Sequence, residues 1–303
     1  AAAAALAMGS VMAQEAPTVP DNVWANKTIS ENLTVDKGQS FTVDSATMTG
    51  GTLTVNGAVN RALDGTNYDG LFTMTGGTIA VGESGNFEVR DFKMSGESKI
   101  TATGSGENTT VNDPHGRTAP AFGSYNSFVM EGGEITLENG GRIWIGSAKK
   151  DNPESYERMQ LNKGTINLAG KGFITGNKRY IEKGDYYDGS VKVDSNTLAY
   201  NVIGLDGVNV SVTGTGNVID AAGTELTAGK LDIAQDAALN IRATTSTNQA
   251  DSKELAQMLK DQSYVSVSGT GVLDVDGRLE VNVKELRLQD GGTINMNTGS
   301  WAG

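Results

Sequence analysis

The sequence predicts an all-β protein with the fold of a parallel β-helix, a solenoid with loop insertions and one short helix. Three observations support this fold class. A phrase of about eight residues recurs along the chain, Gly accounts for 40 of the 303 residues, and only 6% of the residues are aromatic. Gly, Thr, Asn and Val suit short strands joined by tight turns. So few aromatic residues leave little material for a conventional globular core.

Each copy of the phrase has an apolar residue, a polar residue, a Gly-rich corner, and then strict alternation of apolar and polar residues. The copies begin at Met48, Met74, Met130 and Leu161, with looser copies at Leu226 and Gly291. A strand, a turn with positive φ and a second strand explain this phrase. A third strand often follows another Gly, as from Gly85 to Val89. Two or three short strands in a unit of about 20 residues predict one coil of a solenoid.

Subtracting the insertions leaves about ten coils, and at roughly 4.8 Å per coil the rod is about 50 Å long. The alternation predicts which residues point inward. These residues are Met48, Leu53, Val55, Met74, Ile79, Val81, Phe87, Val89, Met130, Ile135, Leu137, Ile143, Ile145, Leu161, Ile166 and Leu168. The alternative is an antiparallel sandwich or barrel, in which Asn56-Gly57 would form a hairpin turn. The repeated phrase favours the solenoid.

The first residues are not expected to belong to the solenoid. An uncharged Ala-rich run ends in Val11-Met12-Ala13, which is typical of the end of a secretory signal peptide cleaved after Ala13. The alternative is an ordinary Ala-rich helix or tail. We therefore divide the chain into a signal peptide remnant, residues 1–13, and one β-helical domain, residues 14–303. Export from the cell follows from this interpretation.

The composition excludes several kinds of function. A net charge of −12 argues against nucleic acid or an anionic membrane surface as a partner, because both need clustered Lys and Arg. One His and no Cys exclude Cys/His zinc sites, haem, iron–sulfur clusters and a Cys nucleophile. We therefore expect no cofactor and no metal. His115 stands in an insertion without a paired acid, and is expected to be an ordinary surface residue.

Four insertions precede the apolar residues that open a phrase, so their loops are expected on one edge of the rod. They are Asn60–Gly70, Gly104–Asn126, Lys149–Glu157 and Asn177–Tyr200. The last carries the candidate ligand-binding residues, which are Arg179, Tyr180, Asp185, Tyr186, Tyr187 and Asp188. Exposed Tyr and Arg are favoured at interfaces. The alternative is a hairpin that packs its Tyr residues against the neighbouring coil.

Two further segments have structural explanations. Residues 251–260 place three apolar residues on one helical face, so a short helix that covers the side of the rod is expected. Asp274 to Gly277 resembles part of a calcium loop, but the remaining ligands of an EF-hand are missing. Its acidic residues alternate with apolar ones, which favours the solvated face of a strand.

An exported, cysteine-free chain built on such Gly/Thr/Asn-rich units resembles the passenger domain of a bacterial autotransporter, with a pertactin-like architecture. The resemblance extends from Val35 to Trp301. It implies a right-handed β-helix displayed outside a Gram-negative cell, attached to the outer membrane or released. It also implies a C-terminal membrane barrel, which this chain does not contain, so we expect a fragment of a longer protein.

We therefore expect a non-enzymatic adhesin that binds glycan or protein of a host cell or its matrix, or neighbouring bacterial cells, through loops on one edge of the rod. The first alternative is a carbohydrate-active enzyme, since parallel β-helices include polysaccharide lyases and hydrolases. The Asp-Asp, Gly-His-Gly and Arg-x-Lys segments of polygalacturonase-like enzymes are absent, and no catalytic residue is assigned. The second alternative is a structural spacer.

Overall fold

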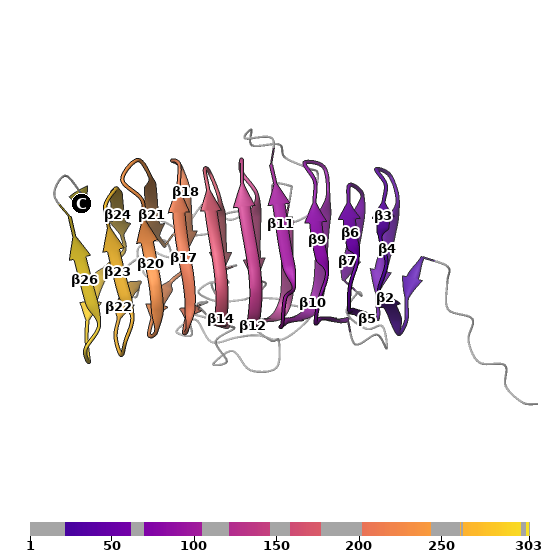
Figure 1. Ribbon diagram of the computed structural model, residues 1–303, viewed down its shortest axis with the longest axis horizontal. Coiled ribbons are helices and arrows are strands. Elements are labelled where there is room, and N and C mark those ends of the chain that lie inside the picture. The colour runs from indigo at the N-terminus through magenta and orange to yellow at the C-terminus, as the bar shows by residue number, and fades with distance from the viewer. Residues whose placement is uncertain are drawn as a thin grey trace, which may run out of the picture.

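The computed structural model describes residues 22–61, 70–104, 121–145, 158–176, 202–243, 261, 263–297 and 301–302. Its strands form one continuous parallel sheet that coils round an axis, which confirms the β-helix (Figure 1). Strands of successive coils lie side by side along the rod, from β2 near one end to β26 near the other. Asn56-Gly57 joins two strands of the same coil, so the hairpin of the alternative fold is not formed.

The coil has three walls, called sheets A, B and C in the order in which the chain visits them. Sheet A contains β2 (Lys27–Ile29), β5 (Ser45–Met48), β8 (Leu71–Met74), β16 (Val202–Leu205), β19 (Gly223–Leu226), β22 (Tyr264–Val267) and β25 (Glu285–Leu288). Sheet B contains β3 (Leu33–Val35), β6 (Thr52–Val55), β9 (Thr78–Val81), β11 (Lys99–Thr103), β17 (Val208–Thr213), β20 (Gly229–Ile233), β23 (Val272–Val275) and β26 (Thr293–Met296). Sheet C contains β1 (Val23–Trp24), β4 (Ser40–Val43), β7 (Ala58–Arg61), β13 (Arg142–Ile145), β15 (Phe173–Gly176), β18 (Asn217–Asp220), β21 (Ala238–Arg242), β24 (Arg278–Asn282) and β27 (Trp301–Ala302).

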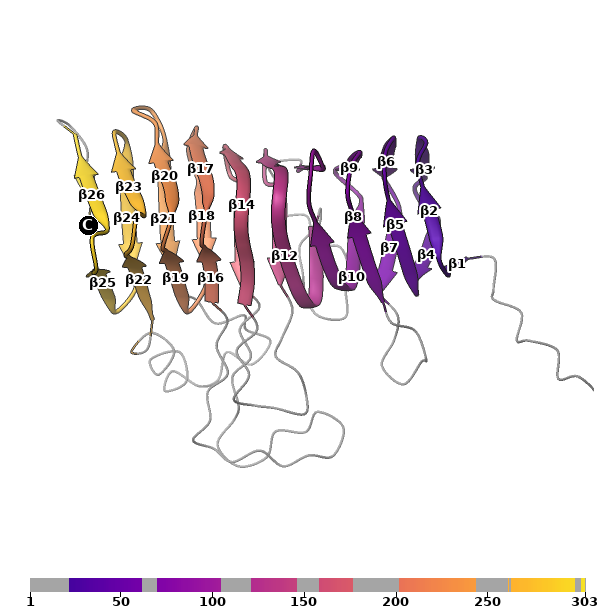
Figure 2. The ribbon, with the colours of Figure 1, turned by 60° about the horizontal axis from the view of Figure 1, so that its bottom comes forward.

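Three longer strands turn corners and so contribute to more than one sheet. They are β10 (Asn86–Met94) in C and A, β12 (Ala121–Glu138) in C, A and B, and β14 (Arg158–Ala169) in A and B. With β12 and β14 added to its other eight members, sheet B has ten strands among the described residues, one for each coil. This agrees with the coil number predicted from the repeats. Figure 2 shows the strands of sheet B above those of sheet A, as with β26 and β25.

The corner between sheets A and B explains the Gly-rich part of the repeated phrase. Gly51 and Gly77 occupy equivalent corners and have φ of 68° and 84°. A Cβ atom on Gly77 would lie 2.7 Å from the backbone of Gly50 in the preceding coil. Both the positive φ and the close approach of the stacked backbones therefore require glycine here.

The apolar residues fill the inside of the coil as the alternation predicts. Fifteen of the sixteen predicted inward residues are at most 2% exposed, and the side chain of Ile145 lies outside the described residues. One further feature was not predicted, a ladder of buried phenylalanines along the corner between sheets C and A. Its members are Phe72, Phe87, Phe92, Phe122 and Phe128. Phe122 is central, with ring centroids 4.8 Å from Phe87 and 4.9 Å from Phe92.

The prediction that residues 104–126 form a loop throughout was wrong, because residues 121–124 belong to sheet C. They pair in parallel with β10 on one side and β13 on the other. Phe122 points inward and continues the phenylalanine ladder, whereas Gly123 leaves room for the ring of Trp144, whose atoms would lie 2.3 Å from a Cβ there. A glycine interrupts the alternation of apolar and polar residues, so the strand is difficult to recognise in the sequence.

The insertions leave the rod at two different corners of the coil. Residues 62–69, 146–157, 177–201 and 244–260 join a strand of sheet C to the next strand of sheet A. Residues 105–120 instead join sheet B to sheet C, so the prediction of one common edge was wrong for this insertion. Asn60 and Arg61, predicted in a loop, are part of β7. The predicted helix at residues 251–260 lies outside the described residues, and the described part of the chain holds no helix long and apolar enough to cross a membrane.

One polar side chain in the core provides a test of the packing. Thr224 is 1% exposed, lies between Ile203 and Val265 of neighbouring coils, and its Oγ1 has no hydrogen-bond partner in the described structure. Thr224→Val replaces this buried hydroxyl with a methyl group of similar size. We expect the free energy of unfolding to rise by about 1 kcal/mol, measured by chemical denaturation.

Thr227→Val is the matched control, because the Thr227 Oγ1 donates a hydrogen bond of 2.9 Å to Asp206 Oδ1. Thr227→Val removes this hydrogen bond, so it should not stabilise the protein. A less stable Thr224→Val variant would show that the Thr224 hydroxyl does have a partner.

Candidate functional site

The ligand-binding residues predicted from the sequence lie outside the described residues. These residues, Arg179, Tyr180, Asp185, Tyr186, Tyr187 and Asp188, all fall in the segment 177–201, and His115 is also outside. The segment 177–201 joins β15 to β16, so it continues directly from a strand of sheet C. Sheets C and A therefore flank it in sequence, and of the two we consider the outer surface of sheet C first.

The outer surface of sheet C carries two rows of side chains, because alternate residues of each strand point away from the core. The parallel register aligns Arg142, Phe173, Val218, Asn240 and Glu280 in the first row. It aligns Trp144, Thr175, Asp220, Arg242 and Asn282 in the second. All members of the first row are half-buried. They therefore form a partly sheltered strip along the rod.

A cluster of two arginines, a phenylalanine and a carboxylate lies at one end of this strip. The guanidinium of Arg142 stands 4.4 Å from the centroid of the Phe173 ring, and that of Arg242 stands 5.6 Å from it. Arg242 Nε donates to Asp220 Oδ2 at 3.1 Å, and Asp220 is only 4% exposed. Within the described part of the chain, the Arg142 guanidinium has no hydrogen bond or ion pair.

The described residues of this cluster carry two positive charges and one negative charge. Burial lowers the pKa of Arg142, the Asp220 carboxylate raises it, and the positive charge of Arg242 lowers it. A guanidinium stays protonated at physiological pH in spite of such shifts. Among the described residues, two positive charges therefore lie near one carboxylate, and Asp220 is bonded to Arg242. Arg142 has no ion pair in this described part, on a chain of net charge −12.

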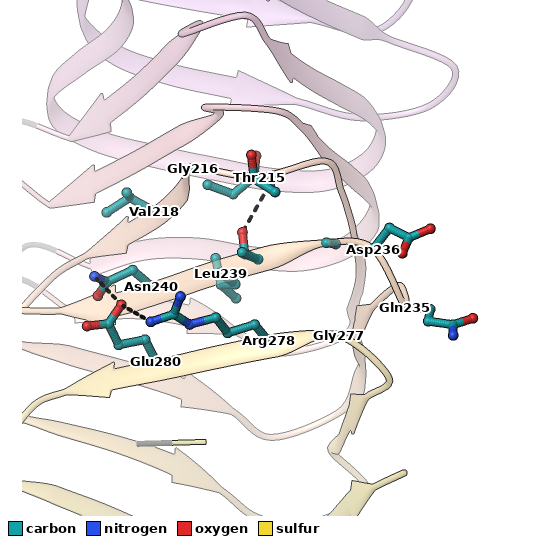
Figure 3. Close-up of a pocket in the computed structure, with 13 residues that line it drawn as sticks. Thr215, Gly216, Val218, Gln235, Asp236, Leu239, Asn240, Gly277, Arg278 and Glu280 are labelled. Atoms are coloured by element: carbon teal, nitrogen blue, oxygen red, sulfur yellow. Dashed lines mark hydrogen bonds and ion pairs between the residues drawn. The ribbon is translucent and has the colours of Figure 1, made fainter. Parts of the chain in front are cut away.

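A hollow of about 710 Å³ continues the strip toward the C-terminal coils (Figure 3). Val218, Asn240 and Glu280 of the first row line it, together with Thr215 and Asp236 from the neighbouring corners. Asn240 Nδ2 donates to Glu280 Oε2 at 3.4 Å. Amide, hydroxyl and carboxylate groups and the Arg278 guanidinium thus surround an open space, next to the cluster at Phe173.

The floor of the hollow is held by a buried asparagine at the corner between sheets B and C. Asn217 is 1% exposed, and its Oδ1 accepts a hydrogen bond of 3.0 Å from the backbone N–H of Gly172 in the preceding coil. Its Nδ2 donates to the carbonyls of Thr213, Gly214 and Ala238 at 3.0–3.3 Å. One side chain therefore links three successive coils and fixes the shape of the surface above it.

The possible calcium ligand Asp274 is engaged by a lysine. Lys230 Nζ lies 2.8 Å from Asp274 Oδ2, and the hydrogen bond that Lys230 donates to Asp274 raises the pKa of Lys230. Asp274 faces outward from β23 in sheet B, as the alternation predicts. The described residues contain no group of three or more His, Cys, Asp or Glu side chains that could hold a metal ion.

Sequence reasoning did not identify Arg142, Phe173 and Arg242 as functional residues. The strand that contains Arg142 and Trp144 was recognised, and its outward residues could have been listed from the alternation. The residues that lie beside them in the next coil could not be identified from the sequence. The 12 residues 146–157 separate β13 from β14 and hide the register that pairs Arg142 with Phe173. Only the folded coil brings them together.

The arrangement suits recognition of a polar, extended ligand. An arginine held over an aromatic ring offers a planar fork of donors, and the hollow offers amide and carboxylate groups for hydroxyls. A search for related proteins adds nothing to this assignment: no family model, no curated protein and no solved structure matches the chain.

Proposed function

We propose that this chain is a surface-displayed or secreted bacterial adhesin that binds glycan or protein of a host cell or its matrix. The observation that carries the proposal is the strip on sheet C, in which the Arg142–Phe173 pair continues into a polar hollow. The signal-peptide-like start of the sequence and the resemblance to autotransporter passenger domains support export and display. Attachment to neighbouring bacterial cells would use the same surface.

A rigid solenoid is well suited to such binding. Each outward side chain is fixed by a strand that pairs on both sides, so little conformational entropy is lost when a ligand binds. The segment with the predicted ligand residues follows β15, the strand that carries Phe173. A ligand on sheet C would thus lie next to the origin of this segment, and both could contribute to one binding surface.

A carbohydrate-active enzyme is the second candidate, because Asp236 and Glu280 both line the hollow. Glycoside hydrolysis uses two carboxyl groups, one of which must give up a proton to the leaving group. Glu280 Oε2 instead lies 4.0 Å from Arg278 Nη2 and accepts a hydrogen bond from Asn240. Glu280 is thus engaged by two polar neighbours on sheet C. A structural spacer is the remaining alternative.

The role of the segment 177–201 can be tested by deleting residues 180–188. We expect weaker binding to host cells or matrix, with unchanged thermal stability, because the deletion spares every described strand. Binding would be measured with the purified protein on immobilised matrix and on cells. Deletion of residues 105–113 is the control, since these nine residues leave the rod from the corner between sheets B and C.

Equal binding by the wild type and the 180–188 deletion would remove that segment from the site. If neither deletion nor substitutions on sheet C affected adhesion, the spacer would be favoured over the adhesin.

A further inference from the structure

We infer that Arg142 binds the carboxylate of a sparsely charged acidic glycan, whose neutral sugars extend along the first row into the hollow. This inference rests on the proposed binding function and names the ligand class. It is drawn from the contrast between Arg142 and the other arginines, from the direction of the row, and from the charge of the whole chain.

Arg142 differs from comparable arginines because it lacks an acidic partner. Arg61 Nε lies 2.9 Å from Glu88, Arg242 Nε lies 3.1 Å from Asp220, and Arg287 Nη2 lies 2.7 Å from Glu285. Arg142 has no such partner in the described structure, although it is half-buried. Partial burial of a cation without an ion pair costs free energy, because the charge loses part of its hydration. An anionic ligand that pairs with the cation would offset this cost.

The Phe173 ring positions the guanidinium for this role. At 4.4 Å from the ring centroid, the Arg142 side chain is stacked rather than free to swing in solvent. A planar guanidinium matches a carboxylate through two parallel N–H···O bonds. Less side-chain conformational entropy is lost on binding when the guanidinium is already held in place. Burial, which lowers the pKa of Arg142, also strengthens its attraction to a bound anion.

The row sets the length and direction of the ligand. From Arg142 on β13, four coil steps through β15, β18 and β21 lead to Glu280 on β24. At about 4.8 Å per step the row is about 19 Å long, which fits an oligosaccharide rather than a single sugar. Beyond Phe173 the row offers Val218 and Asn240, which suit an apolar sugar face and hydroxyl groups.

The charge of the chain limits how acidic the ligand can be. The net charge is −12, and Asp236 and Glu280 line the hollow beyond the arginine cluster, where Arg278 lies 4.0 Å from Glu280. A densely sulfated polymer would place anions next to these carboxylates along the row. A single carboxylate at Arg142 is affected mainly by the local charges, because salt screens exposed charges beyond about 8 Å. The ligand should therefore carry its carboxylates on no more than every second sugar.

The test uses three oligosaccharides of equal length, with binding measured by equilibrium dialysis on the full chain. They are a hyaluronan fragment (one carboxylate for every two sugars), a neutral chitin fragment and a heparin fragment (densely sulfated). We expect the hyaluronan fragment to bind most tightly. Arg142→Ala should weaken its binding about tenfold or more, which is the scale of a lost charge-assisted pair, and should affect the chitin fragment little.

Arg287→Ala is the matched control. Arg287 also stacks on an aromatic ring, 4.4 Å from the centroid of Tyr264, but on sheet A and with its own carboxylate partner Glu285. It should leave all three affinities unchanged. Arg142→Lys, which keeps the charge and loses the planar fork, should give an intermediate affinity for the hyaluronan fragment, and thermal denaturation would check that each variant is folded.

Equal binding of the acidic and neutral fragments, or an unchanged preference in Arg142→Ala, would overturn the inference and leave the proposed adhesin function standing. Tightest binding of the heparin fragment would overturn the sparse-charge argument. If the folded wild type bound none of the three, this ligand class would be wrong, and the cell and matrix assays would decide separately on the adhesin function.

Discussion

Phe122→Ala is expected to lower the free energy of unfolding by about 3–5 kcal/mol, the usual range for deleting a buried phenylalanine. The Phe122 side chain is fully buried, and its ring lies 4.8 Å from that of Phe87 and 4.9 Å from that of Phe92. The solenoid cannot collapse around the cavity, because the strands on both sides are held at a fixed spacing by the backbone ladder. Chemical denaturation would measure the loss.

Phe41→Ala is the control for this prediction. Phe41 is only partly buried and contacts the core near the first coil, where its ring stacks on Trp24 at 5.3 Å. Its replacement should cost clearly less than that of Phe122. Equal losses, or a loss below about 1 kcal/mol for Phe122→Ala, would contradict the continuous phenylalanine ladder.

Asn217→Ala is expected to lower the free energy of unfolding by about 3 kcal/mol. It leaves the Gly172 N–H and the Ala238 carbonyl without the Asn217 side chain as their partner, whereas the Thr213 and Gly214 carbonyls still accept from backbone N–H groups. Buried backbone groups that lose a hydrogen bond cost about 1–3 kcal/mol each, and water entering the corner would recover part of this. The effect should be local, because each coil contacts only its neighbours.

Hydrogen exchange would locate this effect. We expect faster exchange of the amides of β15, β18 and β21, with little change in β5 or β6 at the other end of the rod. Asn240→Ala is the control, because the Asn240 side chain points outward and its two hydrogen bonds are each 3.4 Å long. If the amides of the Asn217→Ala variant exchanged no faster than those of this control, the Asn217 side chain would not be what links the three coils.

The coil itself could be predicted from the sequence because its determinants are local. Alternation with period 2 marks the inward residues, such as Leu53 and Val55, and the glycines mark the corners where φ is positive. The number of coils follows from counting such units. Residues 121–124 were missed because Gly123 and Ser124 replace the apolar alternation, although Phe122 is inward.

The candidate site depends on register between coils, which the sequence does not contain. Arg142 and Phe173 are 31 positions apart, and the insertion between them has no counterpart in the shortest coils. Their contact arises only when Arg142 pairs with Phe173 across two strands of sheet C. The loop residues predicted from composition, Arg179 and Tyr180 among them, remain a prediction outside the described residues.

The central claim is that the outer surface of sheet C binds a glycan without altering it. Its most direct test is to incubate the purified chain with the hyaluronan fragment, and to measure both the bound fraction by dialysis and the fragment length by mass spectrometry. The account predicts saturable binding that Arg142→Ala weakens, with every fragment recovered at its original length. Shortened fragments would establish the carbohydrate-active enzyme instead, and absence of binding to a folded chain would contradict the assignment of this surface.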